Sequence, residues 1–588
     1  MKTFWKIFFG ALLGCIAAMV VLTFLGIGMI GSIASSFSEK SETVVTKNTI
    51  LKIDFETPIT EQSTETFNFS LSLAGASSPE MSTSLSLLKA VQAIDKAAQD
   101  PNIKFIYMTP NQLNMSISAA EEVRKAIDRF RSSGKAVISS TQLLDNGTYY
   151  MTSVADKVVL NPYADCMISG LSTQIMFYKD LIDRLGLDVQ LIRHGKYKSA
   201  GEPFIKNDIS PENRAQTEAM LRAIWDAMAE DMASSRDFSK EELDAWIDNL
   251  AIDSAEAAKE KGLVDELWYR DELVEYICSL AGVEKEKDLK MITLPEYASS
   301  LKSDYKSKDK IAVIYADGEI VMGDEGRDGY IGDSFAREIE KARRDSCVKA
   351  VVLRVNSPGG SVQASAIIQR EIELLKAVKP VYASYGEYAA SGGYWISCDC
   401  DKIFSDKTTL TGSIGVFGII PSYGNALKKN VHVNTVEVAT HRHGSMAGVF
   451  PLDKEEVASM QNSIEDIYTK FTTLVAGSRG MTVGAVDEIA QGRVWAGSEA
   501  LGIGLVDEIG TLTDAIDYAA AAASLEKYRI VEYPAEKDMF SRLMESFGKS
   551  GAKAAESPAD LLQKTEKWLT GVSEPAIEAR IPYMFDIK

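Results

Sequence analysis

The stretch Gly386-Glu-Tyr-Ala-Ala-Ser-Gly-Gly-Tyr394 separates a strand predicted at 381–385 from a helix predicted at 394–398. Its serine, Ser391, stands at the start of that helix between residues with small or no side chains. A hydroxyl in this position would be accessible to a substrate carbonyl. Tight helix packing favours the same Ala, Ser and Gly residues, so the stretch alone leaves both explanations open.

The chain contains a second copy of this neighbourhood, shifted by 245 positions. Three pairs of landmarks coincide in that register: Asn111 with Asn356, 147–149 with 392–394, and 156–157 with 401–402. Self-similarity at a fixed spacing indicates a duplicated structural unit. Ser391 then corresponds to Asn146, and the Ser357-Pro-Gly-Gly360 turn corresponds to residues 112–115. One copy therefore carries a hydroxyl and a glycine turn that the other lacks.

Both copies show the same alternation of strands and helices. Residues 49–55 predict an opening strand, 62–82 a loop and 87–98 a helix. In the first copy the strands are predicted at 103–108, 136–140 and 157–160, with helices at 119–131 and 149–155. In the second copy the strands are predicted at 350–355, 381–385 and 402–404, with helices at 364–377 and 394–398. Such alternation predicts an α/β fold with mainly parallel sheets.

The duplication sets the expected domain boundaries. Gly262-Leu-Val-Asp-Glu266 recurs as Gly504-Leu-Val-Asp-Glu508, so each unit spans about 240–250 residues. We expect an N-terminal anchor at 1–45, a first unit at 46–300 and a second unit at 301–535. Residues 536–588 form a C-terminal tail outside the repeat.

The N-terminus predicts a membrane anchor. From Phe8 to Ile33 the chain carries no charge, and Lys2 and Lys6 precede this run. About 20 apolar residues span a bilayer, and leading lysines favour a cytoplasmic N-terminus. The remainder would then lie on the extracytoplasmic side. A cleaved signal peptide is the alternative, because small residues follow at 34–36.

Composition excludes some classes of function. The 588 residues are too many for one core and predict two or more domains. A net charge of −20 argues against nucleic-acid binding, which needs clustered Lys and Arg. The six cysteines show no zinc-type spacing and no disulfide framework.

A second loop with chemical potential is Arg354-Val-Asn-Ser-Pro-Gly-Gly-Ser361, which follows a β-branched run and precedes a helix. Gly359 and Gly360 permit a sharp turn that exposes backbone N–H groups. The positive end of the following helix would add to the attraction for an oxyanion. A purely structural turn between strand and helix is the alternative for this motif.

A nucleophilic serine needs a base. The chain has four histidines, His194, His432, His441 and His443, and none has an Asp partner suggested by spacing. His441 and His443 could bind a metal, but Arg442 between them and the absence of a nearby acidic ligand count against this. A neutral lysine is the other possible base. Composition does not choose among the lysines.

Four motifs resemble the signal peptide peptidase A family, peptidase family S49, in its long, duplicated form. They are Leu353–Ser361, Ala389-Ala-Ser-Gly-Gly-Tyr-Trp395, Leu410-Thr-Gly-Ser-Ile-Gly415 and Tyr197-Lys-Ser-Ala-Gly-Glu-Pro-Phe204. The resemblance implies that Ser391 is the nucleophile and Lys198 the general base. It also implies that Ser413 orients the lysine and that Gly359 and Gly360 supply the oxyanion-hole N–H groups. The first unit would then provide the base and the second the serine.

The resemblance carries further expectations. It implies the Clp-protease and crotonase superfamily fold, a homotetramer, and a membrane-anchored serine endopeptidase of the inner membrane that degrades remnant signal peptides and other hydrophobic peptides. It implies no cofactor and no metal. Two alternatives remain open: an acyl-CoA enzyme of the crotonase type, which would carry an acidic residue at position 391, and a catalytically inactive membrane scaffold.

Overall fold

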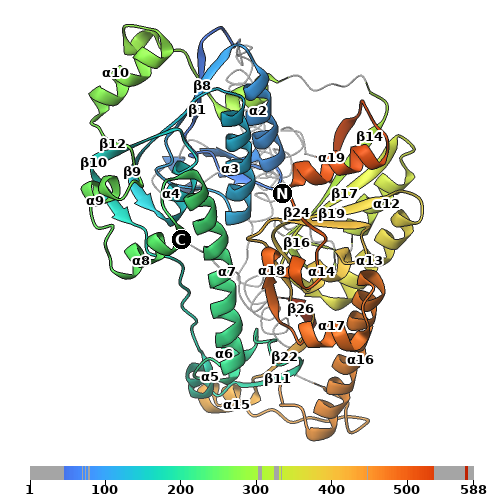
Figure 1. Cartoon of the computed structure of the whole chain (residues 1–588). Coiled ribbons are helices and arrows are strands. Elements are labelled where there is room, and N and C mark those ends of the chain that lie inside the picture. The colour runs from blue at the N-terminus through green and yellow to red at the C-terminus, as the bar shows by residue number, and fades with distance from the viewer. Residues whose placement is uncertain are drawn as a thin grey trace, which may run out of the picture.

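The computed structural model describes residues 45–68, 71–72, 75–76, 80–301, 307–323, 330–332, 334–446, 448–535 and 576–580. Figure 1 shows two α/β units side by side, the first in blue to green and the second in yellow to orange. Within these residues no helix has the length and apolar character needed to cross a membrane. The apolar run Phe8–Ile33, predicted to be the anchor, lies outside the described residues.

The first unit is built on a six-stranded sheet in which all described pairings are parallel. Its order is β12 (Glu266–Leu267), β10 (Lys157–Met167), β9 (Val137–Asp145), β8 (Ile103–Met108), β1 (Thr49–Ile53) and β13 (Met291–Thr293). The covering helices include α2 (Leu87–Gln99), α3 (Ile117–Ser132), α4 (Asn146–Thr152) and α7 (Pro211–Ser235).

The second unit repeats this plan on an eight-stranded sheet. Its main order is β23 (Val494–Ala496), β21 (Leu410–Gly412), β19 (Val381–Ala390), β17 (Val348–Ser357), β14 (Lys310–Asp317) and β25 (Arg529–Tyr533). Two more strands extend it from β19, namely β20 (Lys402–Ser405) and β24 (Glu508–Ile509). Its helices include α13 (Val362–Lys376), α14 (Gly392–Ser397), α16 (Lys454–Arg479), α18 (Gly497–Gly502) and α19 (Leu512–Ala522). Buried apolar strand residues and one helix face form each core.

The predicted duplication is confirmed at the level of single hydrogen bonds. The Asp156 carboxylate accepts the Val137 N–H at 2.8 Å, and the Asp401 carboxylate accepts the Val381 N–H at 2.8 Å. The two Gly-Leu-Val-Asp-Glu motifs also make matching contacts. The Asp265 carboxylate accepts the Val158 N–H, and the Asp507 carboxylate accepts the Ile403 N–H. Each carboxylate thus accepts from the N–H of a strand residue in the same way in its own unit.

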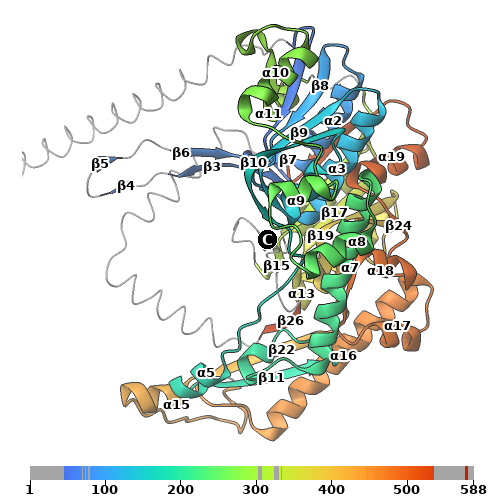
Figure 2. The ribbon, with the colours of Figure 1, turned by 60° about the vertical axis from the view of Figure 1, so that its left-hand side comes forward.

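A third, mixed sheet joins the two units. Its order is β11 (Asp188–His194), β22 (Val416–Ser422), β26 (Ala576–Arg580), β18 (Gly359–Ser361), β15 (Glu319–Ile320) and β16 (Tyr330–Ile331). Strand β11 comes from the first unit and pairs antiparallel with β22 of the second. Figure 2 shows this pair in a lobe, with α5 (Lys179–Leu185) and α15 (Gly424–Ala426), that projects from the body of the molecule.

One expectation about local structure is wrong. Residues 62–82 were expected to be a loop because they are rich in Ser and Thr, but they contain the antiparallel strands β3 (Glu65–Asn68) and β6 (Glu80–Thr83). Thr has a high preference for strands, and pairing with a neighbouring strand overrides a polar composition. The hairpin projects from the first unit (Figure 2).

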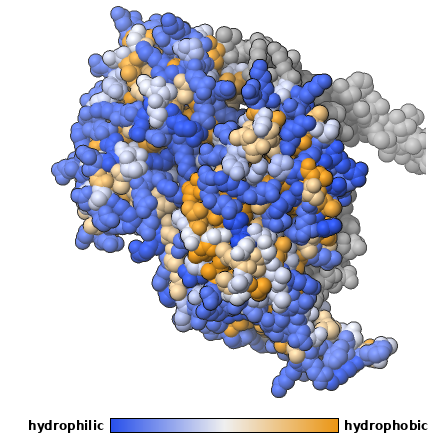
Figure 3. Space-filling view, turned by 45° about the vertical axis from the view of Figure 1, so that its right-hand side comes forward, coloured by the Kyte–Doolittle hydropathy of each residue, from blue (hydrophilic) through white to orange (hydrophobic). Residues whose placement is uncertain are grey.

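One face of the described surface is mainly hydrophilic. In the view of Figure 3 most of the described surface is hydrophilic, and apolar residues gather in the middle of that face. All described cysteines are free thiols, as expected from their spacing.

Candidate active site

Ser391 lies where β19 ends and α14 begins. Its backbone has φ 55° and ψ −110°, an uncommon conformation for a residue with a side chain. Its N–H donates to the Gly412 carbonyl at 2.8 Å, and its carbonyl accepts the Trp395 N–H at 2.8 Å. These bonds fix the turn, which places the serine hydroxyl at the carboxyl end of a parallel strand, where sites form in α/β folds.

Lys198 of the first unit reaches this serine. Its Nζ lies 2.8 Å from Ser391 Oγ and 3.0 Å from both the Oγ and the carbonyl oxygen of Ser413. All three side chains are fully buried, at 0% exposure. The Phe417 ring, 5.9 Å from Nζ, contributes an apolar wall. The three residues singled out in the sequence therefore meet within one chain.

The loop that carries Lys198 is held by the second unit. Gly195 has φ 105°, and a side chain there would lie 2.4 Å from the Gln491 carbonyl oxygen. The same carbonyl accepts the Tyr197 N–H at 2.9 Å. Gly492 is equally close, because a Cβ there would lie 2.7 Å from Lys198 Cβ. The lysine backbone thus packs directly on the Gln491-Gly492 turn.

The first unit braces the lysine loop from the other side. Arg193 Nη1 donates to the Lys198 carbonyl at 2.7 Å and lies 3.4 Å from the buried Glu202 carboxylate. That carboxylate also accepts from Ser210 at 2.9 Å. Glu202 belongs to the same sequence motif as Lys198, and this contact accounts for its presence there.

Ser413 is held in a similar way to Ser391. It follows β21, has φ 49°, and donates its N–H to the Arg493 carbonyl at 2.7 Å. Its Oγ also lies 3.4 Å from the Gly492 carbonyl oxygen. The loop containing Gln491, Gly492 and Arg493 therefore contacts both Lys198 and Ser413. The sequence contains no signal for this loop, because Gly492 has no side chain and lies 294 positions after Lys198 (492 − 198).

The glycine turn lies beside the serine. Gly359 and Gly360 have φ 99° and 149°, and a Cβ on Gly360 would lie 2.0 Å from the Ile320 carbonyl oxygen. Gly393, two residues after Ser391, packs so closely that a Cβ there would lie 2.6 Å from the Ser357 carbonyl oxygen. The Gly359 N–H lies 3.2 Å from Ser357 Oγ. Gly359 and Gly360 both have a backbone conformation that other residues rarely adopt.

The corresponding place in the first unit has no comparable arrangement. Asn146 accepts the N–H groups of Ser169 and Gly170 at 3.1 Å and donates to the Gly170 carbonyl at 2.9 Å. Its amide therefore fastens a loop. Arg442, one position before the register counterpart of Lys198 (198 + 245 = 443), is exposed and pairs with Glu455.

The other candidate bases lie apart from Ser391. Lys196 is exposed, with its ammonium over the Tyr197 ring. His194 contacts Glu465 at 2.6 Å, and His432 and His441 are exposed.

The expectation that His443 has no acidic neighbour is wrong. The start of α16 brings Glu456 to 3.0 Å and places Asp453 nearby. Asp453 already caps α16 through the Glu455 and Glu456 N–H groups, and it pairs with Arg442.

A strand from the C-terminal tail lies beside the glycine turn. Strand β26 runs antiparallel between β18 and β22, with Gly359 opposite Arg580 and Gly418 opposite Ile577. The space between the turn and β22 thus accommodates one extended backbone.

Comparison with known sequences gives the family. The profile of peptidase family S49 matches residues 129–284 and again residues 373–526. The chain belongs to peptidase family S49. The double match agrees with the duplication and fits the long form of the family.

Full-length relatives support this assignment. The S49 chain is 33% identical over 512 residues to Protease 4 of Haemophilus influenzae, covering 85% of this chain and 83% of that protein. It is 36% identical over 484 residues to Protease 4 of Salmonella typhi, covering 81% and 78%. It is 30% identical over 518 residues to the chloroplastic serine protease SPPA of Arabidopsis thaliana, covering 86% and 74%. The S49 chain is therefore a serine protease.

Proposed function

We propose that this S49 protease cleaves peptides with a Ser391–Lys198 dyad. The observation that carries the proposal is the 2.8 Å contact between Lys198 Nζ and Ser391 Oγ, both fully buried. A nucleophile and a base within hydrogen-bond reach, with the base oriented by a third group, are what acyl transfer requires. Ser413 is the third group here.

The first half of the reaction forms an acyl-enzyme. Ser391 Oγ attacks the peptide carbonyl while its proton passes to the neutral Nζ of Lys198. The oxyanion of the tetrahedral intermediate lies at the Gly359–Gly360 turn, where backbone N–H groups stabilise it. Lys198, now an ammonium, donates its proton to the leaving amine as the C–N bond breaks.

The second half releases the product. Lys198, neutral again, removes a proton from a water molecule that attacks the acyl carbonyl. The Ser391 ester bond then breaks, and Oγ takes the proton back from Nζ. Only the neutral amine can accept a proton in each half of the reaction.

We propose that the substrate binds as an extended strand between β18 and β22. Strand β26, which already pairs with both, supports this mode. Main-chain pairing of this kind recognises an extended peptide largely independently of its sequence. Unfolded chains fit such a site, whereas folded proteins do not present a free strand.

The setting of the enzyme is also a proposal. The uncharged run Phe8–Ile33 and the motif resemblance support an inner-membrane anchor with both units on the periplasmic side. They also support remnant signal peptides and other hydrophobic peptides as substrates, a Clp-protease and crotonase-like fold and a homotetramer. The acyl-CoA alternative would need an acidic side chain at 391, and the serine that stands there contacts Lys198.

The dyad is tested by Ser391→Ala and Lys198→Ala in the full chain with a hydrophobic reporter peptide. Each should lower kcat at least about 10³-fold, as removing a nucleophile or its base does in other serine proteases. Lys196→Ala, an exposed lysine two positions away, is the matched control and should stay within about two-fold. Near-normal kcat in either dyad variant would sink the proposal.

A further inference from the structure

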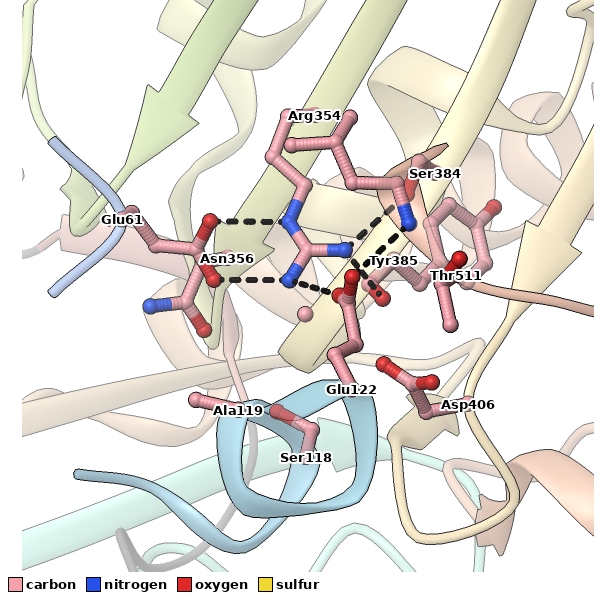
Figure 4. Close-up of polar contacts among 12 residues, drawn as sticks. Glu61, Ser118, Ala119, Glu122, Arg354, Asn356, Ser384, Tyr385, Asp406 and Thr511 are labelled. Atoms are coloured by element: carbon pink, nitrogen blue, oxygen red, sulfur yellow. Dashed lines mark hydrogen bonds and ion pairs between the residues drawn. The ribbon is translucent and has the colours of Figure 1, made fainter. Parts of the chain in front are cut away.

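A buried arginine lies at the junction of the two units. Arg354, on β17 of the second unit, is fully buried, and its guanidinium contacts two carboxylates of the first unit (Figure 4). Glu61 accepts from Nε at 2.8 Å and from Nη2 at 3.0 Å. Glu122 of α3 forms an ion pair with Nη2 at 2.8 Å. A buried charge of this kind is stable only when groups of opposite charge lie close to it.

The same guanidinium also ties two strands of the second unit together. Arg354 Nη1 donates to Ser384 Oγ at 2.9 Å and to the Tyr385 carbonyl at 3.0 Å, both on β19. Strand β17 leads into the Gly359–Gly360 turn, and β19 leads into Ser391. One side chain therefore joins both strands that end in the site to the unit that carries Lys198.

Glu121, next to Glu122 on α3, holds the segment of the second unit that leads to Ser413. Glu121 accepts the Lys407 N–H at 3.1 Å, and from Thr408 it accepts the N–H at 3.2 Å and the hydroxyl at 3.0 Å. Residues 407–408 lead into β21, which ends at Gly412 directly before Ser413. Glu122 thus contacts Arg354, which holds β17 and β19, and Glu121 contacts the segment that leads into β21 and Ser413.

The repeat shows that these contacts are not a by-product of the shared fold. In the register of 245, Arg354 corresponds to Thr109 (354 − 245), and Glu121 and Glu122 correspond to Ala366 and Ile367 (121 + 245 and 122 + 245). At these positions the first unit therefore carries only the acidic residues and the second unit only the arginine. Pairing is possible only between unlike units.

We propose that the Glu61–Arg354–Glu122 cluster, with Glu121 beside it, is a positioning device that aligns the oxyanion turn and Ser391 on Lys198. The inference rests on the proposed dyad. It makes Arg354, Glu61, Glu121 and Glu122 positioning residues that touch no substrate. An error of about 1 Å in such alignment can cost about 10²-fold in rate.

The test compares Arg354→Met with Arg124→Met in the full chain. Arg124 of α3 is a matched control because it too is a buried arginine. Among the described residues its hydrogen bonds go to first-unit groups only, those of Tyr150, Ser153, Asp231 and Ser235. Rates are normalised to the sites titrated with a fluorophosphonate, and melting temperatures are recorded. Arg354→Met should lower kcat per titrated site about 10²-fold with KM within about three-fold. Arg124→Met should lower the melting temperature but keep kcat per site within about three-fold.

Milder variants keep the test decisive if Arg354→Met does not fold. Glu61→Gln keeps the shape of the side chain and should lower kcat per site about ten-fold, and Arg354→Lys should lie between wild type and Arg354→Met. Glu122→Gln added to Arg354→Met should lower kcat little further, since both changes break the same Arg354–Glu122 contact. Equal kcat per site in Arg354→Met and Arg124→Met, or in Glu61→Gln and wild type, overturns the proposal. Full activity of Ser391→Ala would instead overturn the dyad itself.

Discussion

Two serines of the site have backbone conformations that L-residues seldom adopt. Ser391 and Ser413 have φ 55° and 49°, and both lie where a parallel strand ends. Each such residue costs about 1–3 kcal/mol and persists only when its surroundings hold it. The backbone bonds to Gly412 and Arg493 do so. The strain coincides with the place where Lys198 Nζ reaches both hydroxyls.

Loss of the Ser413 hydroxyl should weaken but not abolish activity. In Ser413→Ala the lysine keeps its contacts with the Ser413 carbonyl and Ser391 Oγ and loses one hydrogen bond. We expect kcat/KM to fall about 10–100-fold, as for one hydrogen bond to a charged or reacting group. Ser422→Ala is the control, because that hydroxyl is buried and has no hydrogen-bond partner among the described residues. An unchanged kcat/KM in Ser413→Ala would contradict an orienting role.

At the scale of elements, the site depends on a loop without reactive side chains. Gly492 has φ 78° and lies against the Lys198 backbone. Gly492→Ala forces a Cβ into that contact and should destabilise the fold by about 1–3 kcal/mol. The displaced lysine should lower kcat at least about ten-fold. Denaturant unfolding and steady-state kinetics measure the two effects.

The control for this loop is Gly484→Ala. Gly484 lies in α17 (Val483–Ile489), and a Cβ there would meet nothing within 4 Å. Alanine in a helix should be neutral or stabilising by up to about 1 kcal/mol. A loss of kcat in Gly484→Ala equal to that of Gly492→Ala would show that the contact with Lys198 is not the cause.

The tail strand gives a second test at this scale. If substrates pair with β18 and β22, then β26 competes with them, and a chain ending at Ala535 should bind the reporter peptide with a several-fold lower KM at unchanged kcat. A synthetic peptide spanning 574–582 should inhibit that shortened chain competitively. A lower melting temperature together with an unchanged KM would make β26 a structural strand instead.

At the scale of the whole molecule, the proposed mechanism divides one site between the two units. Lys198 comes from the first and Ser391 from the second, and β11 pairs with β22 along its whole length of seven residues. We expect no peptidase activity from residues 46–300 or 301–588 expressed separately. Turnover of the reporter peptide by either fragment alone would contradict this division.

The junction between the units should also respond to pH. Asp406 is fully buried near Glu122 and Lys125, and neither carboxyl oxygen has a hydrogen-bond partner among the described residues. Burial, together with the carboxylates of Glu122 and Glu121, raises the pKa of Asp406 well above its ordinary value of 3.8. The folded state therefore keeps a proton that the unfolded chain releases.

The sign of the effect follows from that retained proton. A group with a raised folded pKa contributes stability that is lost as pH rises from its unfolded pKa through its folded one. Asp406→Asn, which resembles the protonated acid, should match wild type near pH 4 and become the more stable protein as pH rises. Guanidinium unfolding of both proteins between pH 4 and 8 measures the difference. A difference that does not change with pH would show that Asp406 is ionised in the folded protein.

The sequence by itself determined the repeat, the α/β class and the order of strands and helices around Ser391. Periodic apolar segments and glycine turns specify local structure, so both copies were predictable to within a few residues. The four motifs also singled out Lys198, Ser391 and Ser413, the residues of the proposed site. The hairpin between β3 and β6 was not predictable, because strand pairing compensates for its polar composition.

Only the tertiary structure decided how the two units meet. Nothing in sequence spacing links Lys198 to Gly492, Arg354 to Glu61 and Glu122, or β26 to the glycine turn. These contacts join residues that are hundreds of positions apart, and they depend on the packing of one unit against the other. The physical reason is that a buried charge or a missing Cβ matters only once the opposing surface is in place.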